Sequence, residues 1–216
     1  MPSSTSTFRP LSGRPFVVGL TGSIAMGKSE TAKMFQSLGV PVYDADAVVG
    51  ELYAPGGAAV TAIAAAFPGV VDAGGGIDRV VLSKLVLGDK VAVSRLEDIV
   101  HPFVEAGRRD FLKTAISQAQ ALVVMDIPLL FETGGEERVE AVVVVSAPAD
   151  MQRERALVRE GMTEEKFESI LALQMPDEEK RERADYIVDS SQGLDYAFKQ
   201  VKKIVAQLRE QAMQRN

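Results

Sequence analysis

The chain has 216 residues, a net charge of −6, no cysteine and a single histidine, His101. This length suffices for one buried core with small inserted lobes. The composition excludes disulfide frameworks, cysteine nucleophiles, Ser-His hydrolases and HExxH metalloproteases. The excess of acidic over basic residues, 30 to 24, argues against a general nucleic-acid binder, and no run of 18 apolar residues is present to span a membrane. We therefore expect no nucleic-acid partner and no membrane partner.

The N-terminal segment has the composition of a tail. Its first 14 residues are rich in Ser and Thr, contain Arg9 and Arg14, and have no acidic residue. Transit peptides share this composition, but the prolines here are incompatible with an amphipathic helix. We predict a disordered tail over 1–14. Because no apolar signal segment is present, we expect a cytoplasmic protein.

A phosphate-binding pattern follows the apolar run Phe16–Leu20, which predicts a buried strand. Gly22 to Ser29 have the spacing G-x-x-x-x-G-K-[ST], and helical spacing after Ser29 places this loop between a strand and a helix. Lys28 is expected to reach the β- and γ-phosphates of a nucleotide, and the Ser29 hydroxyl to ligate Mg²⁺. A glycine-rich turn without a ligand is the alternative. The residues predicted to bind a nucleoside triphosphate are Gly22, Ser23, Ile24, Ala25, Met26, Gly27, Lys28, Ser29 and Glu30.

Four further apolar runs, at 40–43, 122–125, 141–145 and 186–188, predict strands. Their continuous apolarity suits strands that are buried on both faces of a parallel sheet. Helical patterns lie between the runs, so βαβ units are the natural assembly. We expect an α/β fold of three layers with about five parallel strands.

The long segment between the second and third predicted strands contains turn signals at Pro55-Gly56-Gly57 and Gly74-Gly75-Gly76, with helix-like runs between and after them. We interpret 52–118 as an inserted helical lobe, which in kinases of this size holds the phosphoryl acceptor. Pro102 is expected at the first position of the last helix of this lobe. His101 is either structural or a contact to the substrate.

Two predicted strands end in acidic residues, at the edge of the sheet where ligands bind. Asp44 and Asp46 follow the second strand, and Asp126 follows the third. Acids at this edge can hold Mg²⁺ or accept the proton of an attacking hydroxyl. If strand pairing persists to Asp46, it shares a face with Asp44. The alternative for each acid is a helix cap or a solvated loop, and which of the three binds Mg²⁺ directly stays open.

Arg155 and Arg159 are four residues apart in a helical pattern, so they are expected on one face of a helix. Such a pair can clamp a transferring phosphoryl group. Gly161 breaks this helix and Thr163 begins the next, so 150–176 has the shape of a closing lid. A solvated helix with internal salt bridges is the alternative, which the phosphate loop makes the weaker one.

The predicted organisation is a single domain over 15–216. Its core comprises 15–51, 119–149 and 177–209, and a helix with an apolar stripe from Leu194 to Leu208 closes it against the sheet.

Four motifs of the chain occur in the order found in one family. They are G-x-T-G-x-I-x-x-G-K-S at Gly19–Ser29, D-A-D at 44–46, L-E-x-I-x-H-P at Leu96–Pro102 and D-I-P-L-L-F-E at Asp126–Glu132. In this order they resemble the dephospho-coenzyme A kinases, and the resemblance extends over nearly all of 16–200. It implies a P-loop kinase fold and the transfer of the γ-phosphate of ATP to the ribose 3′-hydroxyl of dephospho-CoA.

The resemblance also implies roles for single residues. Lys28 and Ser29 would hold ATP and Mg²⁺, with Asp126 as a further metal ligand. Asp46 would lie next to the acceptor hydroxyl, and Arg155 and Arg159 would be catalytic arginines of the lid. The lobe with His101 would bind the CoA portion. The residues implied to contact the substrate are Asp46, His101, Pro128 and Leu129.

The chain departs from the family pattern at three places. Ala25 and Met26 stand where the family more often has Gly-Ser, and Glu30 where it often has Thr. These positions leave the conserved chemistry of the loop in place. The segment Asp189–Gln192 replaces an asparagine near the last strand, which leaves the contacts to adenine open.

Three other functions are compatible with a phosphate loop. The first is a kinase that phosphorylates a nucleoside or nucleotide on the same scaffold. The second is a nucleotide-dependent switch, which is weaker because guanine recognition normally uses N-K-x-D and the only asparagine is Asn216. The third is an inactive structural relative. The sequence does not determine the oligomeric state, and a monomer is the default expectation.

Overall fold

The structure, a computed structural model, describes residues 13–215 and forms two compact units. The first unit contains the described residues up to Tyr43 and those from Thr114 onward, and the second is Asp44–Lys113. Most of the tail expected over 1–14 lies outside the described residues. The strands are β1 (Phe16–Thr21), β2 (Val42–Asp44), β3 (Leu122–Asp126), β4 (Ala141–Ser146) and β5 (Tyr186–Asp189). The helices are α1 (Lys28–Ser37), α2 (Ala45–Tyr53), α3 (Val60–Ala66), α4 (Arg79–Val86), α5 (Lys90–Ser117), α6 (Ala149–Leu157), α7 (Glu164–Leu171), α8 (Asp177–Glu182) and α9 (Leu194–Gln214), with a 3₁₀ turn at Gly135–Arg138.

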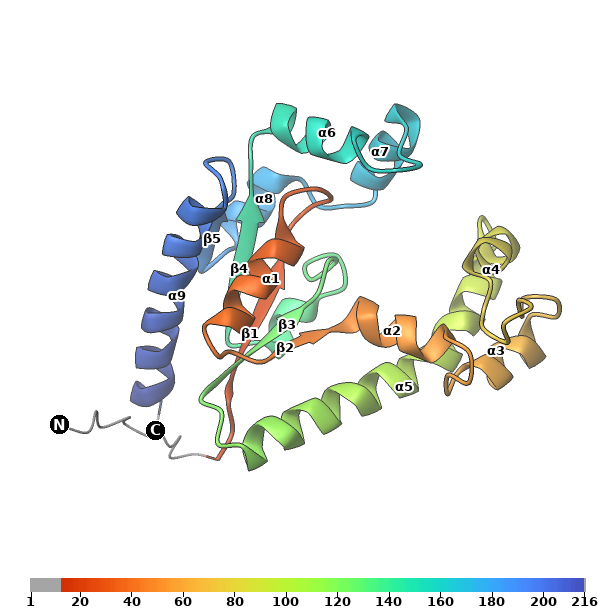
Figure 1. Cartoon of the computed structure of the whole chain (residues 1–216), viewed down its shortest axis with the longest axis horizontal. Coiled ribbons are helices and arrows are strands. Elements are labelled where there is room, and N and C mark those ends of the chain that lie inside the picture. Colours follow the sequence, from red (N-terminus) through yellow and green to blue (C-terminus); the bar gives the residue numbers. More distant parts are fainter. Residues whose placement is uncertain (1–12, 216) are drawn as a thin grey trace. The chain divides into compact units, whose positions relative to one another are not determined.

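The five strands form one sheet in the order β2-β3-β1-β4-β5 (Figure 1). β1 runs parallel to both β3 and β4, and β4 runs parallel to β5. All six residues of β1 are buried, which is why this strand is an unbroken apolar run. The prediction of an α/β fold with five parallel strands is confirmed. The chain passes from β1 to β2 on one side of β1, and later crosses from β3 to β4 on its other side. A crevice for ligands is therefore expected at the carboxyl end of β1.

Helices α1 and α9 lie side by side against one face of the sheet (Figure 1). Their buried side chains, including Phe35, Val201 and Leu208, join the strands in the largest apolar core. The apolar stripe predicted for the last helix is largely present. Leu194 is an exception, 61% exposed at the first position of the helix, and the stripe continues instead to Ala212.

The other face of the sheet is covered by the segment after β3. Leu130 and Phe131 are buried against Val142 and Val144 of β4. Space is tight here, since a Cβ on Gly19 of β1 would lie 2.9 Å from the side chain of Leu130. The segment after β3 is therefore an apolar turn that enters the core.

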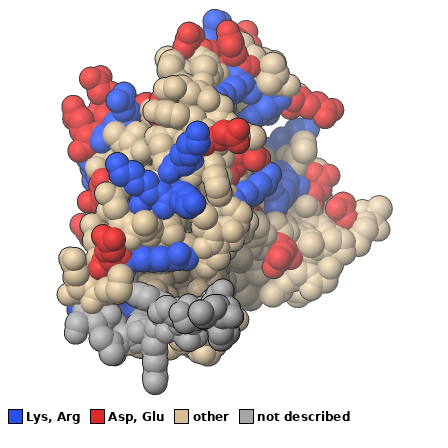
Figure 2. Space-filling view, turned by 60° about the vertical axis from the view of Figure 1, so that its left-hand side comes forward, with Lys and Arg blue, Asp and Glu red and all other residues tan. Residues whose placement is uncertain are grey.

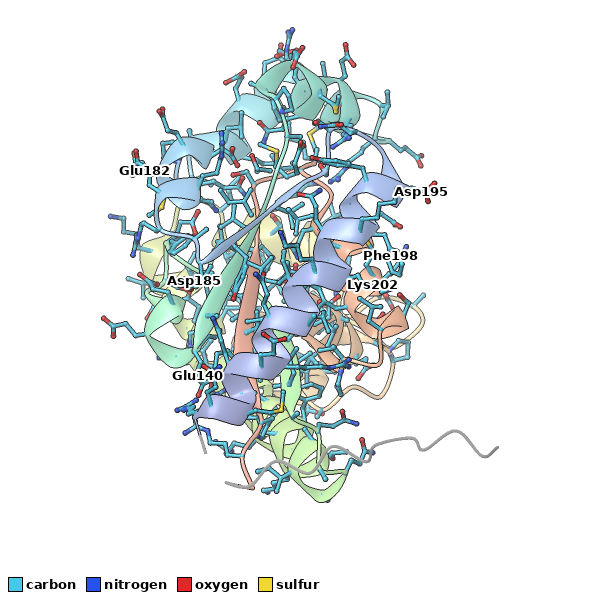
Figure 3. The ribbon with its side chains drawn as sticks, turned by 90° about the vertical axis from the view of Figure 1, so that its left-hand side faces the viewer. Glu140, Glu182, Asp185, Asp195, Phe198 and Lys202 are labelled. Atoms are coloured by element: carbon cyan, nitrogen blue, oxygen red, sulfur yellow. The ribbon has the colours of Figure 1, made fainter. Side chains whose placement is uncertain are left out.

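Two acidic residues at the amino ends of strands, Glu140 and Asp185, lie away from the phosphate loop (Figure 3). Each accepts a hydrogen bond from a backbone N–H of the neighbouring strand, Glu140 from Val17 and Asp185 from Val142. An unpaired N–H at the edge of a buried sheet costs free energy, so these acids stabilise the fold. None of the described helices is long and apolar enough to cross a bilayer.

The second unit has its own apolar core, which includes Ile63, Leu82 and Val100. The unit begins at Asp44 because the apolar residues of α2 pack into this core. The prediction that Pro102 begins a helix is wrong, because Pro102 lies inside α5. Proline lacks a backbone N–H and cannot complete the helical bond to residue 98, but the apolar residues on either side keep the helix continuous.

A buried ion pair connects the segment after β3 to α8. The Lys180 ammonium is fully buried and lies 2.8 Å from Glu132 Oε1, which also accepts the N–H of Met175 at 2.7 Å. Burial alone would raise the pKa of Glu132, but the hydrogen bonds from Lys180 and Met175 outweigh it and lower the pKa below its ordinary value. The ionised carboxylate is thus favoured by the folded state.

We predict that Lys180→Met lowers the free energy of unfolding by about 3–5 kcal/mol at pH 7, because Glu132 is left as an unpaired buried charge. In the wild type the contribution of the pair is complete above the ordinary pKa of Glu132 and is lost as the pH falls through its lowered pKa. In the variant the unpaired carboxyl accepts a proton more readily. The deficit, measured by urea unfolding, should therefore shrink between pH 7 and pH 4.

Two controls accompany this prediction. Lys202→Met removes an exposed lysine of α9 and should change stability by less than about 0.5 kcal/mol. The double variant Glu132→Gln with Lys180→Met should regain part of the lost stability, since no charge remains buried. An equal deficit at every pH, or no deficit at all, would contradict the interpretation of the pair.

Candidate active site

The loop 22–27 between β1 and α1 has the shape that its two glycines allow. A Cβ on Gly22 would lie 2.7 Å from the carbonyl oxygen of Val145 in β4, so only glycine fits there. Gly27 precedes α1 with φ +98°, a left-handed conformation that favours glycine. The loop therefore turns tightly at the carboxyl edge of the sheet, and the N-terminus of α1 follows it directly.

The two residues that depart from the family pattern within the loop are both buried. Ala25 has φ +63°, which is uncommon for a residue other than glycine. Its methyl group packs with Ala156 of α6 and Phe167 of α7 in a small apolar cluster. Met26 is also buried, and its sulfur accepts the backbone N–H of Ala147 at 3.2 Å. Neither substitution opens the loop to solvent.

The structure brings Lys28 and Asp126 together. Lys28 begins α1, and its Nζ lies 2.5 Å from Oδ1 of Asp126, whose side chain is 3% exposed. Asp126 ends β3 opposite Leu20 of β1, so the parallel register delivers the carboxylate to the base of the loop. The ammonium compensates a carboxylate that would be costly to bury alone. Asp126 is thus the partner of Lys28, and a metal role for it stays a proposal.

The donor set for a metal ion in the first unit is oxygen. Ser29 is exposed in the first turn of α1, and the Asp126 carboxylate is the acid beside the loop. Within residues 13–215 no group of three or more His, Asp or Glu side chains forms a metal site on its own. Hydroxyl and carboxylate oxygens suit Mg²⁺, which proteins usually bind through one or two side chains together with substrate phosphates.

A cavity of about 300 Å³ lies between the phosphate loop, α1, α6 and the segment 190–194. Arg155 and Arg159 both line it, together with apolar residues of α1 and α9. The prediction that the two arginines share one helical face is wrong. α6 ends at Leu157, and Arg159 lies in the following turn. The turn nevertheless returns Arg159 to the same cavity.

Ser190, which was not predicted from the sequence, links Arg155 to the phosphate loop at one wall of the cavity. Arg155 donates one guanidinium bond to the Ser190 hydroxyl at 2.9 Å and another to its carbonyl at 2.8 Å. The hydroxyl in turn donates to the carbonyl of Met26 in the phosphate loop at 2.7 Å. Ser190 lies within the segment that departs from the family at the end of β5. That departure was the signal available in the sequence.

Asp189 ends β5 beside Ser190. Hydrogen bonds from the Ser191 side chain and from the Ser191 N–H lower the pKa of Asp189. The ionised carboxylate thus folds the segment back on itself, and Gln200 of α9 bonds to the backbone of Asp189 on the other side. This turn presents Ser190 to Arg155 and to the loop.

The remaining predicted residues fall into two groups. Pro128 and Leu129 follow β3 at the carboxyl edge, where the carbonyl of Pro128 accepts the Thr21 hydroxyl at 3.0 Å and Leu129 is partly exposed. Asp46 and His101 belong to the second unit, and both are exposed, Asp46 in the first turn of α2 and His101 on α5.

Asp44 has the structural role that was the alternative for it. Its carboxylate accepts the N–H of Ala47 at 2.9 Å as the N-cap of α2. The strand ends at Asp44 and the helix begins at Ala45, so strand pairing does not persist to Asp46 and the condition for a shared face is not met. The Asp44 carboxylate caps α2, so Asp44 and Asp46 do not follow the two-residue repeat of a strand that would have placed both on one face.

The charge on the surface is mixed. Figure 2 shows Lys and Arg side chains gathered near the centre of one face, with Asp and Glu side chains around them. A chain of net charge −6 thus still presents local groups of basic side chains on its surface.

Comparison with known proteins identifies the family. The sequence profile of the family described as dephospho-CoA kinase matches residues 16–195. A dephospho-CoA kinase of Rhodopseudomonas palustris strain HaA2 is 55% identical over 190 residues, covering 88% of this chain and 94% of that protein. One from Mesorhizobium japonicum is 54% identical, covering 90% of this chain and 98% of the relative.

Solved structures agree with this match. The crystal structure of TT1252 from Thermus thermophilus superposes with a TM-score of 0.77 at 34% identity, over 90% of this chain and 97% of that one. Dephospho-CoA kinase from Campylobacter jejuni has the same fold, with a TM-score of 0.62 at 22% identity, over 89% and 96% of the two chains. The chain belongs to the dephospho-CoA kinase family.

Proposed function

We propose that this protein transfers the γ-phosphate of ATP to the ribose 3′-hydroxyl of dephospho-CoA, giving CoA and ADP. The observation that carries the proposal is the identity of 55% to a protein named dephospho-CoA kinase over 88% of the chain. The phosphate loop and the pairing of Lys28 with Asp126 support it, because they supply a cation and backbone N–H groups where a triphosphate would bind.

The cavity beside the loop fits the adenosine part of ATP. Its volume of about 300 Å³ and its apolar walls from α1 and α9 suit a purine ring. The planar guanidinium of Arg155 lines the cavity and can stack on a base. Ser190 holds that guanidinium in place, so the loop that lacks the family asparagine still fixes one wall of the cavity.

Phosphoryl transfer requires positive charge around the three phosphates. On binding ATP, Lys28 would contact the β- and γ-phosphates, and Arg159 would contact the transferring group. The catalytic role expected from the sequence for Arg155 as the second lid arginine stays a prediction. Ser29 and Asp126 would hold Mg²⁺, and the bound ion would neutralise phosphate charge. The segment 150–176 would exclude water as a lid.

The second unit would bind the acceptor. Asp46 is the acid proposed to take the proton of the ribose hydroxyl, since transfer of that proton to the carboxylate leaves more negative charge on the hydroxyl oxygen and makes it a better nucleophile. His101 would contact the CoA portion from a substrate lobe that comprises 52–118, and Pro128 and Leu129 would contact it from the segment after β3. The cytoplasmic location and the monomeric state expected from the sequence stay predictions.

The test of this function is mass spectrometry of dephospho-CoA after incubation with the protein, ATP and Mg²⁺. We predict conversion to the mass of CoA, and a loss of about 10²–10⁴-fold in kcat for Lys28→Met, because a charge that stabilises the transition state is removed. Lys33→Met is the matched control, since Lys33 is an exposed lysine of the same helix whose ion pair contributes little.

Lys28→Met also leaves the buried Asp126 without its partner, so the fold must be tested separately. The double variant Lys28→Met with Asp126→Asn removes that unpaired charge and should unfold cooperatively while remaining inactive. ATP binding without any phosphorylation of dephospho-CoA by the wild type would contradict the proposed substrate. A screen of other alcohols as acceptors would then identify the correct one.

Asp46→Asn should lower kcat by about 10²–10⁴-fold with little change in the KM for ATP, because an amide cannot accept the proton of the hydroxyl. Asp44→Asn is the control. It alters only the cap of α2 and should cost at most about 1 kcal/mol in stability. A folded Asp46→Asn variant with near-normal turnover would remove Asp46 from the catalytic role.

A further inference from the structure

Ile24, at the tip of the phosphate loop, has both backbone groups bonded by glutamine side chains. Its N–H donates to Oε1 of Gln174 at 3.0 Å, and its carbonyl accepts from Nε2 of Gln152 at 2.9 Å. The polarity of each bond follows from chemistry, because a backbone N–H can only donate and a carbonyl can only accept. One glutamine therefore acts as the acceptor for Ile24, and the other acts as the donor.

The two glutamines come from opposite ends of the segment 150–176. Gln152 lies in α6 and is 5% exposed, whereas Gln174 follows α7. α6 and α7 lie next to the phosphate loop in Figure 1. The segment is therefore joined to the loop at both of its ends.

Apolar packing reinforces the same contact. Ala25, Ala156 and Phe167 form the centre of a buried cluster, and the side chains of Ile24 and Met162 pack against it. Ala25 keeps a positive φ that costs an L-residue about 1–2 kcal/mol, so its conformation must be determined by its surroundings. The apolar cluster and the two glutamines fix the conformation of Ala25 through residues of α6, of α7 and of the turn after α7.

We propose that Gln152 and Gln174 are positioning residues that hold the phosphate loop in its phosphate-binding shape before the nucleotide arrives. A loop whose N–H groups face an anion lacks the backbone bonds of a helix or strand. If the loop were disordered in the free protein, the free energy needed to order it would weaken the binding of ATP. The two glutamines act through Ile24 and touch no substrate. The proposal rests on ATP as the ligand but not on the identity of the acceptor.

The test compares four single variants by calorimetric titration with ATP and, separately, with dephospho-CoA. Gln174→Glu keeps an oxygen that accepts the Ile24 N–H, whereas Gln152→Glu replaces the donor with a carboxylate that faces the Ile24 carbonyl. Both add one negative charge beside the same residue, so each is the charge-matched control of the other. Gln152→Met and Gln174→Met remove each bond without adding charge.

We expect both methionine variants to raise the Kd for ATP by about tenfold, the cost of leaving one buried polar group unpaired. Gln174→Glu should bind ATP at least ten times more tightly than Gln152→Glu. The Kd for dephospho-CoA should stay within twofold of the wild type in all four variants, and a general defect of the fold would not produce this selectivity.

Three results would overturn the proposal. They are an equal Kd for ATP in the two glutamate variants, methionine variants within twofold of the wild type, and equal weakening of ATP and dephospho-CoA binding. If Gln152→Glu does not fold, the comparison of Gln152→Met with Gln174→Met and Gln174→Glu decides. A wild-type protein that binds ATP but does not phosphorylate dephospho-CoA would contradict the proposed function and leave the comparison of ATP affinities valid.

Discussion

The pairing of the Lys28 ammonium with the buried Asp126 carboxylate is the interaction on which the rest of the site depends. Asp126 is at the end of a central strand and is almost fully buried, so its charge requires a cation close by. Lys28 supplies it from the first residue of α1, and this fixes where the helix begins relative to β3. The same ammonium is the group that would meet the phosphates of ATP. The same contact thus stabilises the fold and holds the Lys28 ammonium at the site.

The loop between β1 and α1 is held mainly by residues outside it. β4 restricts Gly22 through the carbonyl of Val145, the segment after β5 bonds to Met26 through Ser190, and α6 contributes Gln152. A loop that presents its own N–H groups to an anion has few bonds left with which to order itself. Its neighbours therefore supply the order. This explains why residues far apart in the sequence converge on eight positions, Gly22 to Ser29.

Short sequence patterns predicted the strands and the phosphate loop, because these depend on residues that are adjacent in the sequence. Continuous apolar runs identified all five strands, and the spacing of glycine, lysine and serine identified the loop. The predictions were wrong where tertiary packing or helix capping prevailed over the repeat of side chains expected for a helix or a strand. Pro102 stayed inside α5, Arg159 fell beyond the end of α6, and Asp44 capped a helix instead of extending a strand. The bonds that Ser190 and the two glutamines make to the loop could not be predicted from local patterns, because the partners lie more than 100 residues away in the sequence.

Hydrogen exchange of the Ile24 amide in the nucleotide-free protein, resolved by NMR, would test most directly whether the phosphate loop is ordered before ATP binds. We predict exchange about a thousandfold slower than in an unstructured peptide, with little further slowing on addition of ADP, because Gln174 already holds this N–H. Exchange as fast as in an unstructured peptide, with protection appearing only when ADP is added, would show that the nucleotide orders the loop. That result would contradict a preformed site.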